Sequence, residues 1–414
     1  MMLNRLKYNE SVQEFLRRLR HLDYFLIFIV FALCVFGILM IHSATNTGWT
    51  PANANMHRSQ ILFIVSGAGL MFAFAFIDYR LITNLYILIY GGCILLLLIV
   101  LFIGASPGTA NTARWLYIPL PGFGYTSLQP SEIAKIAMIL SLSKFLEVKK
   151  DKFNHIFMLL FIAACIAFPV YLIQRQPSLS ASVVILVSSL IVLFIGGLYY
   201  RTIFIGLALI VPVLVVVWMD LRRANSIIVS RILGYQWQRI ETFLRPIEGS
   251  DEFRQVQQSL YSISSGGLFG KGYGNNGHVI HSHNDFIFSI ISEQFGFVGG
   301  AIVLGVLAML IIKCIHIALR ADDLNGRLIA GGIAGMIMFE TFVNVGVVTA
   351  LLPNTGMTLP FLSYGGTSIW VHMIAIGIVL NIGIPRIKPM FSPDWGDTNN
   401  KRGGEPGWQK NLNL

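Results

Sequence analysis

The chain has 414 residues, of which 55% are hydrophobic and 12% charged, and its mean hydropathy is +0.68. This composition leaves too little polar surface for a water-soluble globular protein and predicts a membrane protein with several spans. The formal net charge of +10 does not indicate nucleic-acid binding, because the basic residues cluster at the ends of apolar runs, where they set membrane topology.

Ten apolar runs are long enough to cross a membrane, and they predict an all-α, polytopic fold. We expect helices at about 24–41, 60–77, 81–103, 129–146, 155–173, 179–197, 202–219, 296–319, 326–348 and 366–384. The first run is not followed by a small-residue cleavage site, so we expect it to remain as a helix. The four cysteines all lie in or at the end of such runs without Cys-x-x-Cys spacing, which argues against disulfides and zinc.

The ten helices form one predicted membrane domain, residues 22–386. A tail at 1–21 precedes it, and a polar tail at 387–414 follows it and is expected to be disordered. Basic residues are frequent in both tails and in alternate turns, whereas the short turns between them hold only Arg58, Arg114 and Arg175. The positive-inside rule therefore predicts a multi-pass protein of the cytoplasmic membrane with both tails cytoplasmic.

A long polar segment, residues 220–284, separates the seventh and eighth predicted helices. Irregular backbone cannot lie in hydrocarbon, because each unpaired N–H and C=O group would cost several kcal/mol there. We therefore expect the segment to lie outside the cytoplasm and to cover a water-filled cavity.

This segment ends in His281-Ser282-His283-Asn284, directly before Asp285. Beside a membrane cavity, a carboxylate such as Asp285 suits general-base chemistry. Two alternatives stay open: Asp285 is the N-cap of the next helix, or it ligates a metal with His281 and His283, although no fourth ligand is evident.

Further ionisable residues lie inside the predicted helices. Glu132 and Lys135 are three residues apart, so they project from one helix face and can neutralise each other. Because ionisable groups inside a membrane span are functional candidates, catalytic and structural roles both stay open for this pair and for Glu340. His42 and His372 are expected to be packing residues.

Three outer segments carry candidate ligand-binding groups. Arg114-Trp115 combines a phosphate-binding guanidinium with an indole suited to the membrane interface. The glycine-rich stretch at 265–274, which includes Lys271, either brings backbone N–H groups close to a phosphate or is a flexible turn. The segment at 352–368 places Pro, Gly and hydroxyl residues at the outer membrane edge, next to the expected cavity.

These motifs, taken together and in order, resemble those of the SEDS family (shape, elongation, division and sporulation), to which RodA, FtsW and SpoVE belong. The resemblance runs from about His21 to Arg386, and its strongest matches are at 114–116, 129–136, 266–274, 283–288, 344–346 and 360–366. Two positions depart from the family pattern. Ser178 stands where the family usually has an acid, and Ala110-Asn111-Thr112-Ala113 lacks the usual lysine-glycine pair.

The resemblance implies ten transmembrane helices and a peptidoglycan glycosyltransferase that polymerises lipid II into a glycan strand at the outer membrane face, for elongation, division or sporulation. It also implies a class B penicillin-binding protein as the partner that supplies the transpeptidase. In this family the catalytic aspartate corresponds to Asp285, and an ion pair of the fourth helix corresponds to Glu132 and Lys135. We predict substrate contacts from Arg114, Glu132, Lys135, Lys271, His283, Asn284, Ser363, Tyr364 and Gly365.

The resulting hypothesis has Asp285 accept the proton of the attacking sugar hydroxyl. Arg114 and Lys271 would stabilise the departing pyrophosphate. No metal site or definite cofactor is predicted, and a divalent cation at the pyrophosphate stays an open option. A lipid II flippase and a degenerate scaffold for the penicillin-binding protein are the alternatives, and a secondary transporter is weaker because the chain shows no related halves.

Overall fold

The computed structural model describes residues 13, 16–45, 56–104, 114–120, 124–176, 178–221, 235–245, 250–275 and 284–385. The chain divides into two compact units, one of Met1–His21 with Ile384–Leu414 and one of Leu22–Gly383. In the first unit residues 16–20 are helical, and the tail at 387–414 that was predicted to be disordered lies outside the described residues. All elements named below belong to the second unit.

Helices occupy each of the ten predicted apolar runs. The bounds are α2 Tyr24–Thr45, α3 Met56–Phe76, α4 Tyr79–Asn84, α5 Tyr86–Ile103, α6 Pro130–Val148, α7 Ile156–Arg175, α8 Leu179–Ile195, α9 Tyr200–Leu221, α13 Ile287–Arg320, α14 Leu324–Val348 and α15 Gly366–Gly383. Among the described residues, seven of these are long and apolar enough to cross a membrane, namely α2, α3, α5, α7, α13, α14 and α15. Helix α8 is apolar but only 17 residues long, and α6 carries four charged side chains.

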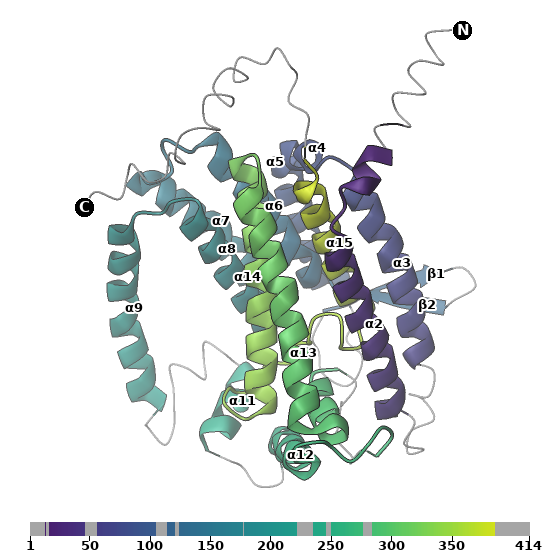
Figure 1. The fold of residues 1–414 in the computed structure, drawn as a ribbon. Coiled ribbons are helices and arrows are strands. Elements are labelled where there is room, and N and C mark those ends of the chain that lie inside the picture. Colours follow the sequence, from purple (N-terminus) through teal and green to yellow (C-terminus); the bar gives the residue numbers. More distant parts are fainter. Residues whose placement is uncertain are drawn as a thin grey trace, which may run out of the picture. The chain divides into compact units, whose positions relative to one another are not determined.

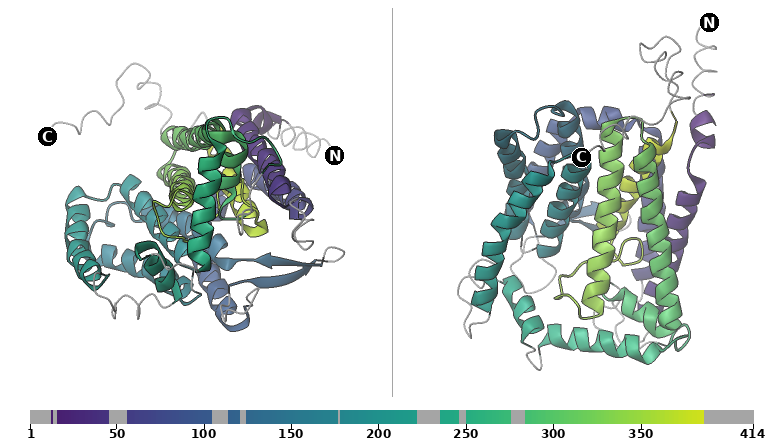
Figure 2. Two further views of the ribbon diagram at one scale, coloured as in Figure 1. Left: turned by 90° about the horizontal axis from the view of Figure 1, so that it is seen from below. Right: turned by 60° about the vertical axis from the view of Figure 1, so that its left-hand side comes forward.

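Helices α14 and α15 form the centre of the bundle (Figure 1). In each of them, 72% of the most apolar stretch is buried, compared with 17% in α5. Helix α14 packs against α13, α8 and α6, while α15 packs mainly against α3 (Figure 2). Residues on these two helices can therefore meet inside the protein, away from lipid.

Glycine allows the close approach of α15 to α3. A Cβ atom at Gly377 would lie only 2.4 Å from the carbonyl oxygen of Met71, so the two backbones touch at this point. On α3, a Cβ atom at Gly67 would lie 3.1 Å from the side chain of Met373. Small residues at helix contacts are the usual means of tight packing between membrane helices.

The segment between α5 and α6 contains a β-hairpin, so the predicted all-α class is correct only for the membrane helices. Strand β1 (Leu116–Leu120) pairs antiparallel with β2 (Gly124–Leu128), and Leu116 lies opposite Leu128. Thr367 joins the hairpin to α15, because its hydroxyl donates to Ser127 O at 2.9 Å and accepts from Gln129 N at 3.1 Å.

The described residues of the polar segment at 220–284 include two helices that the sequence analysis did not predict, α11 (Tyr235–Leu244) and α12 (Asp251–Gly266). Both are amphipathic rather than apolar. Helix α12 begins at an N-cap, since the Ser250 hydroxyl accepts from Phe253 N at 3.3 Å, and it packs against α13 and α14.

Helix α13 begins at Ile287, nine residues before the predicted start at 296, and it is broken at Gly296, where φ is +68° and ψ is −166°. The glycine-rich turn after α12 fills the break. Lys271 N and Gly272 N donate to Glu293 O and Gln294 O at 2.9 and 3.0 Å, and Phe297 N donates to Gly267 O at 2.9 Å. A helix can break inside a protein only where neighbouring groups satisfy its backbone in this way.

This contact explains the glycines of the turn. A Cβ atom at Gly270 would lie 2.2 Å from Gln294 O, and one at Gly266 would lie 2.1 Å from Ser292 O. The N–H groups of Lys271 and Gly272 bind backbone carbonyls of α13, so the turn supports this helix. These two N–H groups are therefore not available to a phosphate, and the turn is held in place rather than flexible. It holds the first turns of α13, which follow directly after Asp285.

Candidate functional site

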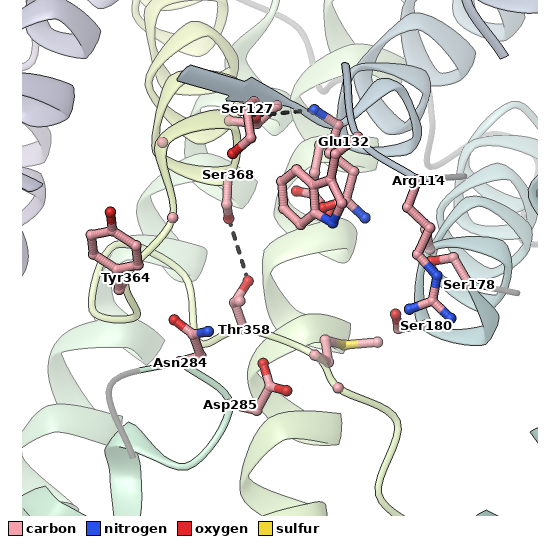
Figure 3. Close-up of a pocket in the computed structure, with 18 of the residues that line it drawn as sticks. Arg114, Ser127, Glu132, Ser178, Ser180, Asn284, Asp285, Thr358, Tyr364 and Ser368 are labelled. Carbon is pink, nitrogen blue, oxygen red and sulfur yellow. Dashed lines mark hydrogen bonds between the residues drawn. The ribbon is translucent and has the colours of Figure 1, made fainter. Parts of the chain in front are cut away.

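A cavity of about 570 Å³ lies where the β-hairpin, α6, the start of α8 and α11 meet the segments around Asp285 and Gly356. Its size is within the usual range for small-molecule sites. Figure 3 shows the side chains of Asp285, Glu132 and Arg114 pointing into this space from three separate segments. The described residues that line it include Arg114, Trp115, Glu132, Lys135, Ser178, Arg239, Asn284, Asp285, Glu340, Thr358, Tyr364 and Gly365.

Asp285 lies just before α13 on an anchored piece of backbone. The N-cap of α13 is Phe286, so the N-cap alternative for Asp285 was wrong. Asn344 of α14 donates through Nδ2 to Asp285 O at 2.8 Å, and Ser363 donates through Oγ to Asn284 O at 2.7 Å. Because Phe286 is 1% exposed, the chain beyond Asp285 is also fixed by packing.

Ser363 does not line the cavity itself but connects two of its walls. Its hydroxyl accepts from Leu359 N at 2.8 Å while it donates to Asn284 O, which closes the turn at 359–363 onto the backbone before Asp285. Tyr364 and Gly365, the next residues, line the cavity. Burial raises the pKa of the Tyr364 hydroxyl, so this group stays protonated and able to donate.

Arg239 of α11 is a cavity residue that the sequence analysis missed. A Cβ atom at Gly356 would lie 3.3 Å from Arg239 Nη1 and 3.4 Å from Asp285 Oδ2, so both charged groups border this glycine. Gly356 has φ +69°. Arg239 was one of seven basic residues in the polar segment, and only the amphipathic pattern of 235–244 distinguished it.

Arg114 enters the cavity from the start of the hairpin. Its Nε donates to Gln176 O at 2.8 Å, which places the guanidinium beside the start of α8. Ser178, which replaces the acid expected from the resemblance, lines the same wall and is 6% exposed (Figure 3). Here Arg114 faces hydroxyl groups of Ser178 and Ser180.

A buried ionic cluster forms the wall opposite Asp285. Lys135 Nζ lies 2.8 Å from Glu132 Oε2, as the spacing on α6 predicts, and 2.5 Å from Glu340 Oε1 on α14. Glu340 Oε2 in turn lies 2.6 Å from His372 Nε2 on α15. Lys135, Glu340 and His372 are 3%, 1% and 0% exposed. Among the described residues, the cavity thus has three cations (Arg114, Lys135 and Arg239) and three carboxylates (Glu132, Asp285 and Glu340).

Of the predicted substrate contacts among the described residues, Ser363 and Lys271 do not line the cavity. Lys271 lies outside its lining and pairs with buried Glu293, the Nζ to Oε1 distance being 2.6 Å. His283 lies outside the described residues, as does His281, so the metal site proposed with Asp285 falls there too. No group of three or more His, Cys, Asp or Glu side chains suited to a metal occurs in the part of the chain that the structure describes.

Comparison with known proteins identifies the family. A family model described as a cell cycle protein, and named for FtsW, RodA and SpoVE, matches residues 24–386. The chain belongs to this family. The resemblance inferred from the motifs is thereby confirmed, and with it the class of helical, polytopic membrane proteins.

Members of the FtsW/RodA/SpoVE family match nearly the whole chain. The stage V sporulation protein E of Bacillus subtilis (strain 168) is 34% identical over 376 residues, which cover 87% of this chain and 96% of that protein. The probable peptidoglycan glycosyltransferase FtsW of Trichlorobacter lovleyi is 33% identical over 395 residues, or 91% of this chain and 97% of that protein. A solved chain from a peptidoglycan synthase complex, described as coordinating polymerization and crosslinking, is 29% identical, with a TM-score of 0.72 and coverage of 87% and 97%.

Proposed function

We propose that this FtsW/RodA/SpoVE family member is a peptidoglycan glycosyltransferase that polymerises lipid II at the outer face of the cytoplasmic membrane. The observation that carries the proposal is the cavity, which brings Asp285 together with Arg114, Lys135 and Arg239 from four separate segments. The glycosyltransferase named among its relatives supports the same activity.

In the proposed reaction, Asp285 accepts the proton of a hydroxyl group on the acceptor sugar while that oxygen attacks the anomeric carbon of the donor. The bond from this carbon to the pyrophosphate breaks, and undecaprenyl pyrophosphate leaves with the bonding electrons. Arg114 and Arg239 both line the cavity and compensate the charge of the pyrophosphate. In this proposal Arg239 takes the role that the sequence analysis assigned to Lys271.

A divalent cation is compatible with one edge of the cavity. Asn284 Oδ1 is buried and has no hydrogen-bond partner in the described part of the structure, and it belongs to the residue before Asp285. The amide oxygen of Asn284 and the carboxylate of Asp285 are both oxygen donors of the kind that Mg²⁺ prefers. When bound, the ion would supply further positive charge for the pyrophosphate, while the chain's own arginines orient the leaving group.

The membrane arrangement that we propose has ten spans, with α4 and α5 together forming the third, and both termini in the cytoplasm. Asp285 and the hairpin then lie toward the outer face, where lipid II carries its sugars. A class B penicillin-binding protein is the proposed partner, which the structural likeness to a chain of a peptidoglycan synthase complex supports.

The test is glycan polymerisation from lipid II by the purified full-length protein in proteoliposomes, with and without its partner. We expect Asp285→Ala to lower the initial rate by at least about 100-fold, the usual contribution of a general base. Polymer yield unaffected by Asp285→Ala would exclude the assigned base. Lipid II translocation that persists in Asp285→Asn without any polymer would favour a flippase, and partner binding without polymer under any condition would favour a scaffold.

A further inference from the structure

Glu340 and His372 form a buried pair to which the proposed reaction assigns no role. They lie on the two central helices, α14 and α15, and His372 Nε2 is 2.6 Å from Glu340 Oε2. The second ring nitrogen, Nδ1, is 2.7 Å from Ser368 O of the preceding helical turn. The sequence analysis expected His372 only to pack, and the ring of Phe361 does cover it, with 5.4 Å between the ring centroids.

These distances fix the number of protons on the pair. A carbonyl oxygen can only accept a hydrogen bond, so Nδ1 carries a proton and donates it to Ser368 O. The contact between Nε2 and the carboxyl oxygen also needs a proton, on one atom or the other. The pair therefore holds one shared proton, either as imidazolium with carboxylate or as imidazole with carboxylic acid, and its net charge is zero in both forms.

The shared proton balances the charge of the whole cluster. Glu340 Oε1 contacts Lys135 Nζ at 2.5 Å, and Lys135 contacts Glu132 at 2.8 Å. With the proton present, the four groups sum to zero charge, whereas its loss leaves a net negative charge. Glu132, Lys135 and Glu340 line the cavity, so that charge would face an anionic substrate.

No other charged group in the described part of the chain contacts His372. Glu340 reaches it from α14, and Lys135 and Glu132 of α6 act on it only through Glu340. Since His372 and Glu340 are 0% and 1% exposed, water does not compensate for a charge left on either one.

We propose that the proton shared by Glu340 and His372 keeps this wall of the cavity neutral and leaves Lys135 available to a pyrophosphate, which makes His372 a positioning residue for glycosyl transfer. The inference rests on the proposed function, because it requires a pyrophosphate-bearing lipid in the cavity. A cavity wall that carried an uncompensated negative charge would bind such a lipid more weakly.

The test compares wild type with His372→Asn, Glu340→Gln and the double variant in the full-length protein. Initial rates of polymerisation, with kcat and KM separated, are measured for each protein, and thermal unfolding reports folding. In His372→Asn the carboxylate of Glu340 has no imidazole with which to share a proton, and we expect KM for lipid II to rise roughly tenfold, the effect of about 1.4 kcal/mol. The double variant replaces the pair with two neutral amides, so we expect it to recover most of that loss.

A binding measurement separates this inference from the proposed function. Undecaprenyl pyrophosphate is titrated into the purified proteins, and His372→Asn is expected to bind it about tenfold more weakly than wild type, whereas the double variant binds it about as tightly as wild type. Such a result without polymer formation would refute the glycosyltransferase proposal but not the role of the pair. If His372→Asn binds as tightly as wild type, or if the double variant binds as weakly as His372→Asn, the inference is overturned. If His372→Asn does not fold, weak binding by the double variant overturns it.

Discussion

The side chain of Asn344 holds the backbone of Asp285 in place. Its Nδ2 donates to Asp285 O at 2.8 Å and to Met357 O at 2.6 Å, so one amide joins α14, the start of α13 and the segment that contains Gly356. The proposed base and the glycine beside it are thus positioned by the same residue. This arrangement explains why an asparagine, 1% exposed, occupies a buried position of α14.

We expect Asn344→Ala to lower the rate of polymerisation strongly and the free energy of unfolding only moderately. Loss of two hydrogen bonds costs about 1–3 kcal/mol of unfolding free energy, whereas displacement of a catalytic group by about 1 Å lowers the rate about 100-fold. The matched control is Asn381→Ala, because buried Asn381 also makes two backbone hydrogen bonds, to Tyr79 N at 3.1 Å and Ala75 O at 2.7 Å, away from the cavity. Equal rate losses in the two variants, measured with lipid II, would contradict a positioning role for Asn344.

Gly356→Ala is expected to lower the rate of polymerisation, because it strains the backbone and places a methyl group against both Arg239 and Asp285. The positive φ costs an alanine about 1–2 kcal/mol, and the added methyl would lie 3.3 Å from Arg239 and 3.4 Å from Asp285. Gly197→Ala separates the two effects, because Gly197 has φ +90° and no atom within 4 Å of an added Cβ. Thermal unfolding should be affected similarly in both variants, and polymerisation only in Gly356→Ala.

Arg239→Ala is expected to reduce kcat/KM for lipid II by about 10- to 100-fold, since it removes one of the cations that face the pyrophosphate. Arg239→Lys should recover only part of the activity, because an ammonium cannot bind a phosphate through two parallel N–H groups. Arg245→Ala, next to the same helix but outside the cavity lining, is the control. A loss of equal size in Arg245→Ala would indicate a general effect of surface charge.

Asp323, the N-cap of α14, makes the free energy of unfolding depend on pH. It lies between the end of α13 and the start of α14, away from the cavity. Burial would raise its pKa, but hydrogen bonds from Tyr79 and Gly326 N, together with the charge of Arg80, outweigh that effect and hold the pKa below the ordinary value of 3.8. The carboxylate therefore stabilises the folded protein above that value, and the stabilisation is lost as the pH falls further. The side chain of Arg80 is 42% exposed, so the expected effect is at most about 1 kcal/mol.

Thermal unfolding between pH 3 and 7 checks this prediction. Asp323→Asn should unfold at a lower temperature than wild type at pH 7, and the difference should shrink at pH 3. Asp322→Asn serves as the control, because Asp322 is the exposed neighbour of Asp323. A difference that stays constant across this range would show that the carboxylate charge is not responsible.

Apolar run length and residue spacing were sufficient to predict the membrane helices and the contact between Glu132 and Lys135. Both follow from local geometry, since residues three apart share a helix face. The partner of Lys135 on α14 was not predictable, because Glu340 is 205 residues away and only the packing of α6 against α14 brings it close. Glu340 could be recognised only as a charged group that needed some partner.

The remaining misses concern segments whose structure depends on tertiary contacts. The hairpin strands at 116–120 and 124–128 belong to a Gly/Pro-rich stretch that Thr367 anchors. Helix α11 is short and polar, so only its amphipathic pattern set Arg239 apart from the other basic residues nearby. The early start of α13 was hidden because the break at Gly296 is stable only with the turn at 267–272 bound to it. The same packing positions Lys271, whose ammonium pairs with Glu293 outside the cavity lining.

The break at Gly296 also couples α13 to α12. The turn that ends α12 is hydrogen-bonded to α13 on both sides of the break, to Glu293 O and Gln294 O before it and to Phe297 N and Val298 N after it. A displacement of α12 would therefore be passed to the first turns of α13, which begin two residues after Asp285.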